Sequence, residues 1–138
     1  MVRVGTDVEA ALAVWGAVQR AASQPPGSAR TARVRAELRA PTSLLLVAGD
    51  PVIGMLLVAL VGRRLELTML CVHPDHQRTG VGRALMAAAV GRYPTIAAWS
   101  SEPALCEALG LVRTGVTRED GSVELGAAPT SRDADAPR

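Results

Sequence analysis

The residues with the clearest chemical potential lie in the segment 70–85, which reads LCVHPDHQRTGVGRAL. Its pattern predicts a strand, then a loop, then a helix whose first turn holds Gly80 and Gly82. Exposed backbone N–H groups at a helix start bind anions, and the helix dipole adds to the attraction. Because glycines let a phosphate approach the backbone, and Arg78 and Arg83 lie nearby, the segment indicates a phosphate or pyrophosphate site. The alternative is a tight strand-to-helix turn that needs its glycines only for the bend.

Two common phosphate-binding motifs do not fit this segment. The P-loop requires a lysine, and the chain contains none. The dinucleotide fingerprint needs a third glycine three positions beyond Gly82, where Leu85 stands, and no Rossmann strand–helix–strand beginning is present. The sequence therefore argues against a P-loop nucleotidase and against a Rossmann dinucleotide site.

The composition restricts the function further. The 138 residues, 49% hydrophobic and 20% charged, are typical of one globular domain. A net charge of +2 and only three aromatic residues give no support to nucleic-acid binding, by charge or by base stacking. No apolar run is long enough to span a bilayer and no signal peptide is recognisable, so we expect a cytoplasmic protein without membrane contact.

The types of residue that are missing carry information too. All 15 basic residues are arginine, and lysine, phenylalanine and asparagine are absent. The codons of these three residues are AT-rich, so we infer a GC-rich, bacterial genome. Cys71 and Cys106 are too few for a four-ligand zinc site, so no metal is expected, and we expect no disulfide in a reducing compartment.

Hydrophobic periodicity and turn residues predict the elements that must position the loop. A capping box of Thr6 and Glu9 opens a helix that ends near residue 22. Further helices are expected at 29–39, 81–92 and 103–109, and strands at 2–4, 42–48, 52–61, 65–72, 95–99, 111–117 and 123–126. This order predicts an α+β or mixed α/β fold, with one largely antiparallel sheet of about six or seven strands and helices on both faces. The domain should occupy residues 1–127, and 128–138 should form a disordered tail.

With these elements in place, the loop resembles a known signature. The pattern V-x-P-x-x-Q-x-x-G-x-G at 72–82 is similar to the acyl-CoA-binding motif of the GNAT superfamily of N-acetyltransferases. That motif has Gln or Arg, two residues, Gly, one residue, then Gly or Ala. The segment LCEALGL at 105–111 resembles the superfamily's late motif, and the resemblance as a whole covers about residues 2–126.

The resemblance implies that acetyl-CoA is the co-substrate, lying in a V between the strand that ends at Val72 and the strand at 95–99. Strand backbone would hold the pantetheine arm, and backbone N–H groups of the loop would hold the pyrophosphate. The residues so implied are Leu70, Cys71, Val72, Gln77, Arg78, Thr79, Gly80, Val81, Gly82 and Arg83. An amine acceptor, either a small molecule or a protein, would attack the thioester directly in a ternary complex of a monomer or homodimer. The alternative is a catalytically weak acyl-CoA sensor or regulatory module.

Glu66 is the candidate general base. By the strand period of two, Glu66, Thr68, Leu70 and Val72 should share one face. A Glu six residues before the Val is the base in some members of the superfamily. The alternative is a structural carboxylate paired with an arginine of residues 63–64.

Cys106 is the candidate general acid, because it stands where the superfamily commonly has a tyrosine. Its thiol could protonate the departing CoA thiolate, or it could be buried filler. Cys71 should alternate away from Val72 into the core, and Trp99 could either line the acceptor pocket or cover the core. The acceptor site is expected from the loop 23–30, the second helix and the last hairpin.

Overall fold

The computed structural model of the chain describes residues 2–93 and 96–127. Within these ranges, seven strands form one sheet in the order β1-β2-β3-β4-β5-β7-β6. Every neighbouring pair is antiparallel except β4 and β5, so the predicted fold class is confirmed. The strands are β1 (Val2–Val4), β2 (Ser43–Ala48), β3 (Gly54–Val61), β4 (Arg64–Val72), β5 (Ala97–Ser100), β6 (Leu111–Thr117) and β7 (Val123–Ala127).

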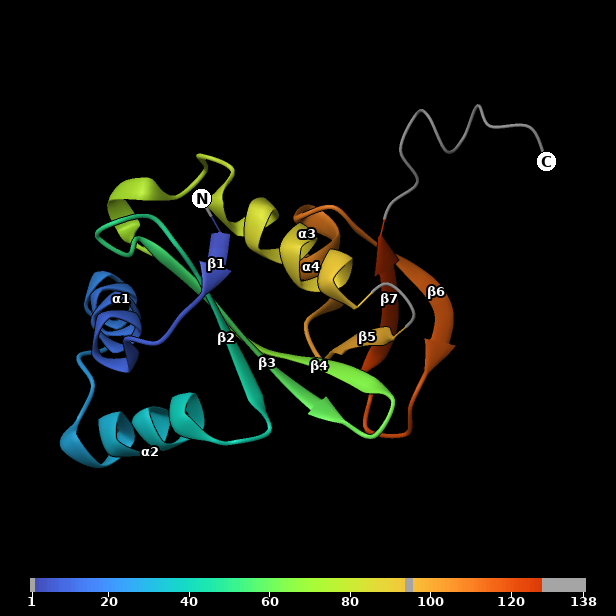
Figure 1. Cartoon of the computed structure of the whole chain (residues 1–138), viewed down its shortest axis with the longest axis horizontal. Helices are drawn as coiled ribbons and strands as arrows, with labels where there is room; N and C mark the ends of the chain where they lie inside the picture. The colour runs from blue at the N-terminus through green and yellow to red at the C-terminus, as the bar shows by residue number, and fades with distance from the viewer. Residues whose placement is uncertain (1, 94–95, 128–138) are drawn as a thin grey trace.

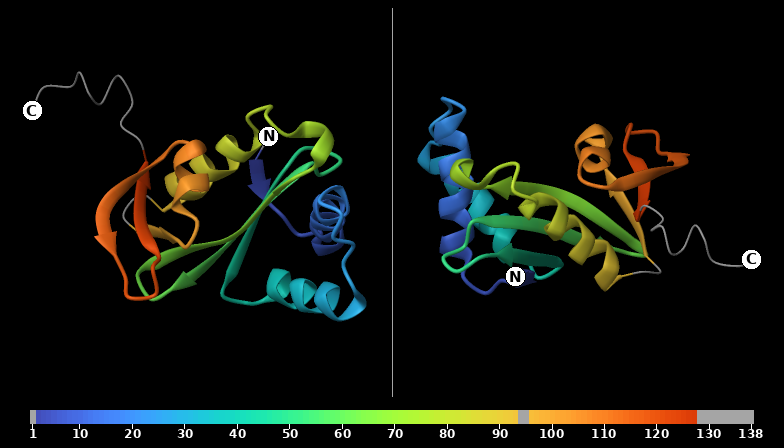
Figure 2. Two further views of the ribbon diagram at one scale, coloured as in Figure 1. Left: turned by 180° about the vertical axis from the view of Figure 1, so that it is seen from behind. Right: turned by 90° about the horizontal axis from the view of Figure 1, so that it is seen from above.

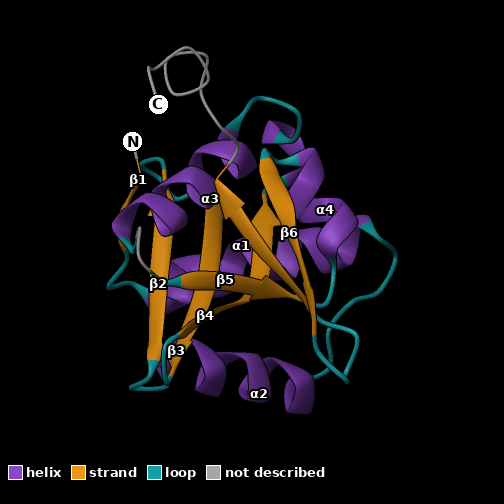
Figure 3. Ribbon diagram, turned by 90° about the vertical axis from the view of Figure 1, so that its right-hand side faces the viewer, coloured by secondary structure: helices purple, strands orange, loops and turns teal. Residues whose placement is uncertain are grey.

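Helices cover both faces of the sheet (Figures 1 and 3). On one face, α1 (Val8–Ala21) and α2 (Ser28–Arg39) bury an apolar cluster against β2, β3 and β4. On the other, α3 (Val81–Arg92) and α4 (Pro103–Ala108) bury a second cluster, which extends to β5 and β7. A short 3-10 turn, η1 (Pro74–His76), stands between β4 and α3. None of the helices in the described ranges has the length and hydropathy needed to cross a bilayer.

The predicted element boundaries hold to within about two residues, and the largest shifts are at the starts of β3 and β5, which begin at Gly54 and Ala97. Residues 94–95 and the expected tail at 128–138 lie outside the described residues. The predicted N-cap is wrong: Asp7, not Thr6, caps α1, and its Oδ1 accepts a hydrogen bond from the N–H of Ala10 at 3.0 Å. A carboxylate in this position also interacts favourably with the helix dipole.

The register between β3 and β4 slips by one residue in the middle of β4. Leu57 pairs with Met69, but the next residue, Val58, pairs with Leu67, so Thr68 is an extra residue in the ladder. The Thr68 hydroxyl donates a hydrogen bond to the carbonyl oxygen of Leu57 at 2.8 Å, which closes this β-bulge. A bulge of this kind bends the strand and changes which residues share a face.

The bulge overturns the expected grouping on β4. Leu65 packs in the cluster beneath α3, and so do Leu70 and Val72 beyond the bulge. Glu66, next to Leu65 before the bulge, therefore points to the opposite face of the sheet from Leu70 and Val72. The prediction that these residues share one face with Glu66 is wrong, whereas Cys71 is buried on the α1 side, opposite Val72, as expected.

Beyond Glu66 the sheet divides. The parallel pairing of β4 with β5 consists of only three residue pairs, from Arg64–Ala97 to Glu66–Trp99. In the left view of Figure 2, the orange and red strands meet the green strands at one end and diverge from them toward the other. In the described part of the chain, the β5-facing edge of β4 has no strand partner from residue 67 onward.

The burial of Cys71 predicts a loss of stability at alkaline pH. Burial raises the pKa of its thiol from 9.0 to about 11, because the thiolate is disfavoured in the folded state. This contribution is fully present below pH 9 and is lost as the pH rises toward 11. We expect the free energy of unfolding, measured in urea, to fall by about 2 kcal/mol over this interval. Cys71→Ala should remove most of that fall, and an equal fall in Cys71→Ala would contradict the assignment.

Candidate functional site

Two cavities lie where β4 and β5 separate, and both touch Leu70 and Leu105. The loop cavity, about 460 Å³, is lined by Leu70, Val72, His76, Gln77, Arg78, Gly80, Gly82, Arg83, Leu105, Ala108 and Leu109. The inner cavity, about 280 Å³, is lined by Trp15, Val18, Gln19, Leu56, Leu67, Thr68, Met69, Leu70, Cys71, Met86, Ser100, Ser101, Glu102, Leu105 and Cys106.

The loop cavity offers an electropositive surface. Gly80, in the left-handed conformation at φ 88°, is the N-cap of α3 and gives the helix no side-chain cap. The first N–H groups of α3 are therefore left without intrahelical acceptors beside the cavity. Arg78 and Arg83 line the same cavity, and Arg83 donates a hydrogen bond to the carbonyl oxygen of Ala108 at 3.0 Å, which ties α3 to α4. This combination of N–H groups and guanidinium charges suits a phosphate-bearing ligand.

Hydrogen bonds hold the loop in shape. The Gln77 side-chain amide donates to the carbonyl oxygen of Val72 at 3.2 Å, and the Thr79 hydroxyl donates to the carbonyl oxygen of His76. The N–H of His73 donates to the carbonyl oxygen of Ile53 at 2.7 Å. Gln77 of the sequence signature thus fastens the loop to the end of β4 in addition to lining the cavity.

Two glycines allow the close approach of α3 to its neighbours. A Cβ on Gly54 would lie 2.7 Å from Cγ1 of Val81, so the start of α3 rests directly on β3. A Cβ on Gly82 would lie 3.3 Å from Leu109 and 3.7 Å from Leu70, both of which line the loop cavity. A larger side chain at residue 82 would therefore project into that cavity.

The structure brings most of the predicted loop residues to this cavity. Leu70, Val72, Gln77, Arg78, Gly80, Gly82 and Arg83 line it. The side chains of Cys71, Thr79 and Val81 do not: Cys71 lines the inner cavity, Val81 is buried in the core, and Thr79 bonds within the loop.

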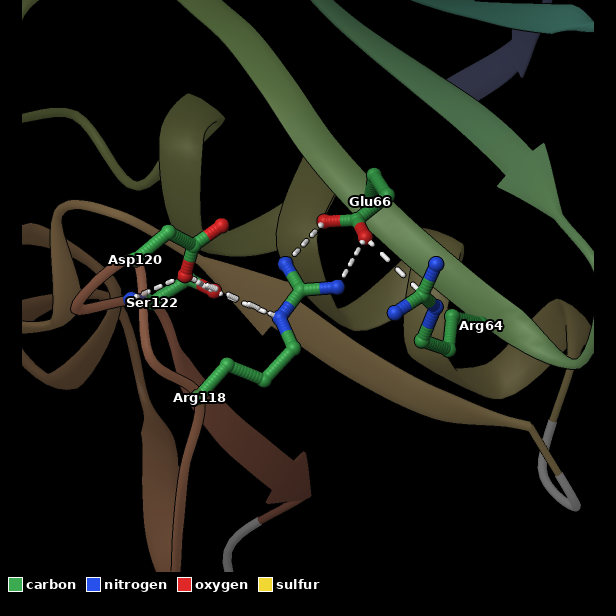
Figure 4. A network of polar contacts seen from close by, with 5 residues as sticks. All are labelled: Arg64, Glu66, Arg118, Asp120 and Ser122. Atoms are coloured by element: carbon green, nitrogen blue, oxygen red, sulfur yellow. Dashed lines mark hydrogen bonds and ion pairs between the residues drawn. The ribbon is translucent and has the colours of Figure 1, made fainter.

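Glu66 is held in a polar network that the sequence did not reveal (Figure 4). Both of its carboxylate oxygens accept hydrogen bonds from the guanidinium of Arg118, at 2.9 and 3.3 Å. The expected pairing with Arg64 is present but weaker, at 3.8 Å. Arg118 Nε also donates to Ser122 Oγ at 2.7 Å, and Asp120 accepts from the N–H and hydroxyl of Ser122.

Trp99 completes this network from β5. The guanidinium carbon of Arg118 lies 4.5 Å from the centre of the indole ring, in a cation–π contact. The hydrogen bonds that Arg118 donates to Glu66 raise the pKa of Arg118, so the guanidinium keeps its charge. Trp99 is buried and lines neither of the two cavities. Arg118 follows Glu66 by 52 positions, and no local pattern connects the two.

Cys106 lies in the core, at 2% exposure, and also forms part of the wall of the inner cavity. Burial raises the pKa of its thiol, and the hydrogen bond with Ser100 only partly opposes this shift. The thiol is therefore protonated at neutral pH. The sequence suggested either a general acid or a buried packing residue. In the structure Cys106 is a buried packing residue whose protonated thiol also lines the inner cavity.

The inner cavity is built from segments other than those expected for an acceptor site. Its walls come from α1, β4 and residues 100–106, with a few side chains from β3 and α3, and include nothing from the loop 23–30, α2 or the last hairpin. Sequence reasoning missed Glu102, which lines this cavity. Glu102 follows the carboxyl end of β5, which runs parallel to β4. Ligands often bind at the carboxyl ends of parallel strands, so this position could have marked Glu102 as a candidate.

A family model for the acetyltransferase (GNAT) domain matches residues 41–112, which is 72 of the 138 residues. The chain therefore belongs to the GNAT acetyltransferase family, as the resemblance of residues 72–82 predicted. No curated protein matches the chain in sequence.

Solved structures share the fold at low sequence identity. An aminoglycoside 6′-N-acetyltransferase complexed with coenzyme A has a TM-score of 0.65 and 11% identity, over 91% of this chain and 94% of its own. The ribosomal-protein-S18-alanine N-acetyltransferase from Escherichia coli has a TM-score of 0.62 and 19% identity, over 91% and 88%. PaiA N-acetyltransferase from Thermoplasma acidophilum, in complex with coenzyme A, has a TM-score of 0.61 and 12% identity, over 91% and 97%. At these identities the likeness establishes the fold alone.

The ion pair predicts a structural role for Glu66. Because both carboxylate oxygens are bound by Arg118, we expect Glu66→Gln to lower the melting temperature while changing the rate on an accepted amine by less than threefold. Arg118→Gln should lower the melting temperature similarly, and the double variant should fall less than the sum of the two. A rate loss of about 10²–10⁴-fold in a folded Glu66→Gln protein would instead identify Glu66 as the general base.

Proposed function

We propose that this protein transfers an acetyl group from acetyl-CoA to an amine acceptor by direct attack in a ternary complex. The observation that carries the proposal is the loop cavity, where an uncapped helix start, close-packed glycines and two arginines meet beside the open edge of β4. Family membership supports the same activity. The proposed catalytic domain comprises residues 1–127.

The residues of the loop cavity fit the parts of coenzyme A. The N–H groups of residues 78–83, together with Arg78 and Arg83, would bind the pyrophosphate. The unpaired edge of β4 at Leu70 and Val72 would hold the amides of the pantetheine arm as an added strand does. The thioester end would then reach the junction of the two cavities, which Leu70 and Leu105 line. Acetyl-CoA would supply an activated acyl group, so the protein has to position the amine and let it lose a proton before it attacks.

A catalytically weak acyl-CoA-binding module is the second candidate. One observation favours it: the two residues that sequence analysis selected for proton transfer have other contacts, since Glu66 is bound by Arg118 and Cys106 is packed in the core. Thiol release from acetyl-CoA across a panel of amines separates the two candidates. Release that depends on the amine supports the enzyme, and coenzyme A binding without release supports the module.

Gly82→Asp tests the proposed cofactor site. The substitution places a carboxylate in the loop cavity, close to Leu70 and Leu109, where the pyrophosphate would lie. We expect the affinity for coenzyme A, measured by calorimetry, to fall at least about tenfold. Gly91→Asp is the matched control, because Gly91 lies on the same helix with open space at its Cβ position. Equal affinities in the folded Gly82→Asp and Gly91→Asp proteins would show that the site is elsewhere, and Arg78→Gln provides a second test.

Cys106 variants separate its two roles. Cys106→Tyr inserts a large side chain at a position that is 2% exposed, so we expect it to cost about 1–3 kcal/mol of stability through overpacking. Cys106→Ser should melt near the wild-type temperature and lose less than about tenfold in rate, because a thiolate leaves readily without full protonation. A loss of more than a hundredfold in stable Cys106→Ser would assign the general acid to Cys106.

A further inference from the structure

The two cavities that meet at Leu70 and Leu105 have opposite charges. The charged side chains at the loop cavity, apart from the titratable His76, are those of Arg78 and Arg83. Among the residues that line the inner cavity, the one charged side chain is that of Glu102. The ligand proposed for the loop cavity, acetyl-CoA, is an anion. The negative charge of Glu102 would instead attract a cation to the inner cavity, and the amine acceptor is a cation when it is protonated.

Glu102 is free to meet a ligand. It is exposed at the start of α4, and its N–H donates a hydrogen bond to Ser100 Oγ at 2.9 Å, which fixes the backbone beneath the side chain. Within residues 2–93 and 96–127, Glu9, Glu66 and Glu107 each bind an arginine, whereas Glu102 forms no ion pair. Glu37, Glu119 and Glu124 form none either, but Glu102 alone of these lines the inner cavity. The carboxylate of Glu102 at the inner cavity is therefore available to pair with a cationic ligand.

The negative charge of Glu102 acts on Cys106, another residue that lines the inner cavity. Burial is the main cause of the raised pKa of Cys106, and the negative charge of Glu102 adds to it. Glu102 and Cys106 line the same inner cavity, so the two groups share its wall. Gln19, Ser101 and Thr68 supply neutral hydrogen-bonding groups on the same cavity.

The remaining walls limit the size and polarity of the ligand. Leu56, Leu67 and Met86 form an apolar side, and the volume of about 280 Å³ lies near the lower end for small-molecule sites. A compact alkyl chain that ends in an ammonium group matches this combination of an apolar wall and a single carboxylate.

We propose that the inner cavity is the acceptor site and that Glu102 binds the ammonium group of a compact alkyl amine without a carboxylate beside its nitrogen; this inference rests on the proposed acetyltransferase function. A free α-amino acid is disfavoured, because its carboxylate would lie within a few ångströms of Glu102, where like charges repel. Glu102 acts in this proposal as a binding and specificity residue. The bound ammonium loses one proton to solvent at the exposed mouth of the cavity before its nitrogen attacks; the new C–N bond replaces the C–S bond, and the second proton of the nitrogen passes to the thiolate of coenzyme A.

The experiment uses n-butylamine as the probe and glycine as the carboxylate-bearing comparison. Butylamine is titrated by calorimetry into the full chain saturated with coenzyme A, and thiol release from acetyl-CoA is followed for both amines. For Glu102→Gln we expect the Kd and KM of butylamine to rise about 10- to 100-fold, with kcat within threefold, because a charge-assisted hydrogen bond is lost. Glu102→Asp should recover part of the affinity. Glu119→Gln is the matched control, since Glu119 lies in the β6–β7 turn and lines neither cavity.

The outcomes separate this inference from the function on which it rests. An unchanged Kd for butylamine in Glu102→Gln, no binding of butylamine to the wild type, or wild-type rates on glycine equal to those on butylamine each overturn the role of Glu102. Coenzyme A binding with amine-dependent release would leave the acetyltransferase proposal standing in all of these cases. Failure of the wild-type chain to bind coenzyme A would overturn both.

Discussion

The separation of β4 from β5 is the constraint on which both cavities depend. Parallel pairing between the two strands ends after three residue pairs, and the bulge at Thr68 bends β4 just beyond that point. A sheet that stayed paired to Val72 would bury the β4 edge and close the space that both cavities occupy. Arg118 acts where the pairing ends: it joins Glu66 of β4 to the last hairpin and covers Trp99 of β5. The opening is thus bounded by an ion pair and a stacking contact.

The charges around this opening are divided in space. Arginines and free N–H groups face the loop cavity, a single glutamate faces the inner cavity, and the apolar side chains of Leu70 and Leu105 stand between them. Elsewhere, Glu9 binds Arg35 and Glu107 binds Arg113, so several carboxylates of the chain are neutralised locally. In the described ranges Glu102 has no such partner, and neither do Glu37, Glu119 and Glu124; what distinguishes Glu102 is that it lines the inner cavity. Opposite charges on either side of an apolar junction can orient two different ligands toward one another.

Much of the fold was predictable because it depends on local signals. The apolar blocks of β2 and β3, the turn at residues 49–51, and the glycines at the start of α3 each specify structure within a few residues. The placement of Glu66 was not predictable in this way. Thr68 is β-branched and suits a regular strand, so nothing in the sequence marks it as the extra residue of a bulge. The contact of Glu66 with Arg118 and the walls of the inner cavity join distant segments, which only the folded chain brings together.

The use of arginine rather than lysine at the loop cavity affects which side chains a thioester could acylate. A lysine in place of Arg78 or Arg83 would bring a primary amine, a group that thioesters can acylate, to the loop cavity proposed for the acyl donor. Guanidinium groups remain protonated and are poor nucleophiles, so they can bind phosphate without consuming the donor. Since the chain has no lysine anywhere, it offers no side-chain amine to its own chemistry. No lysine of this protein could therefore be acylated by the donor that we propose.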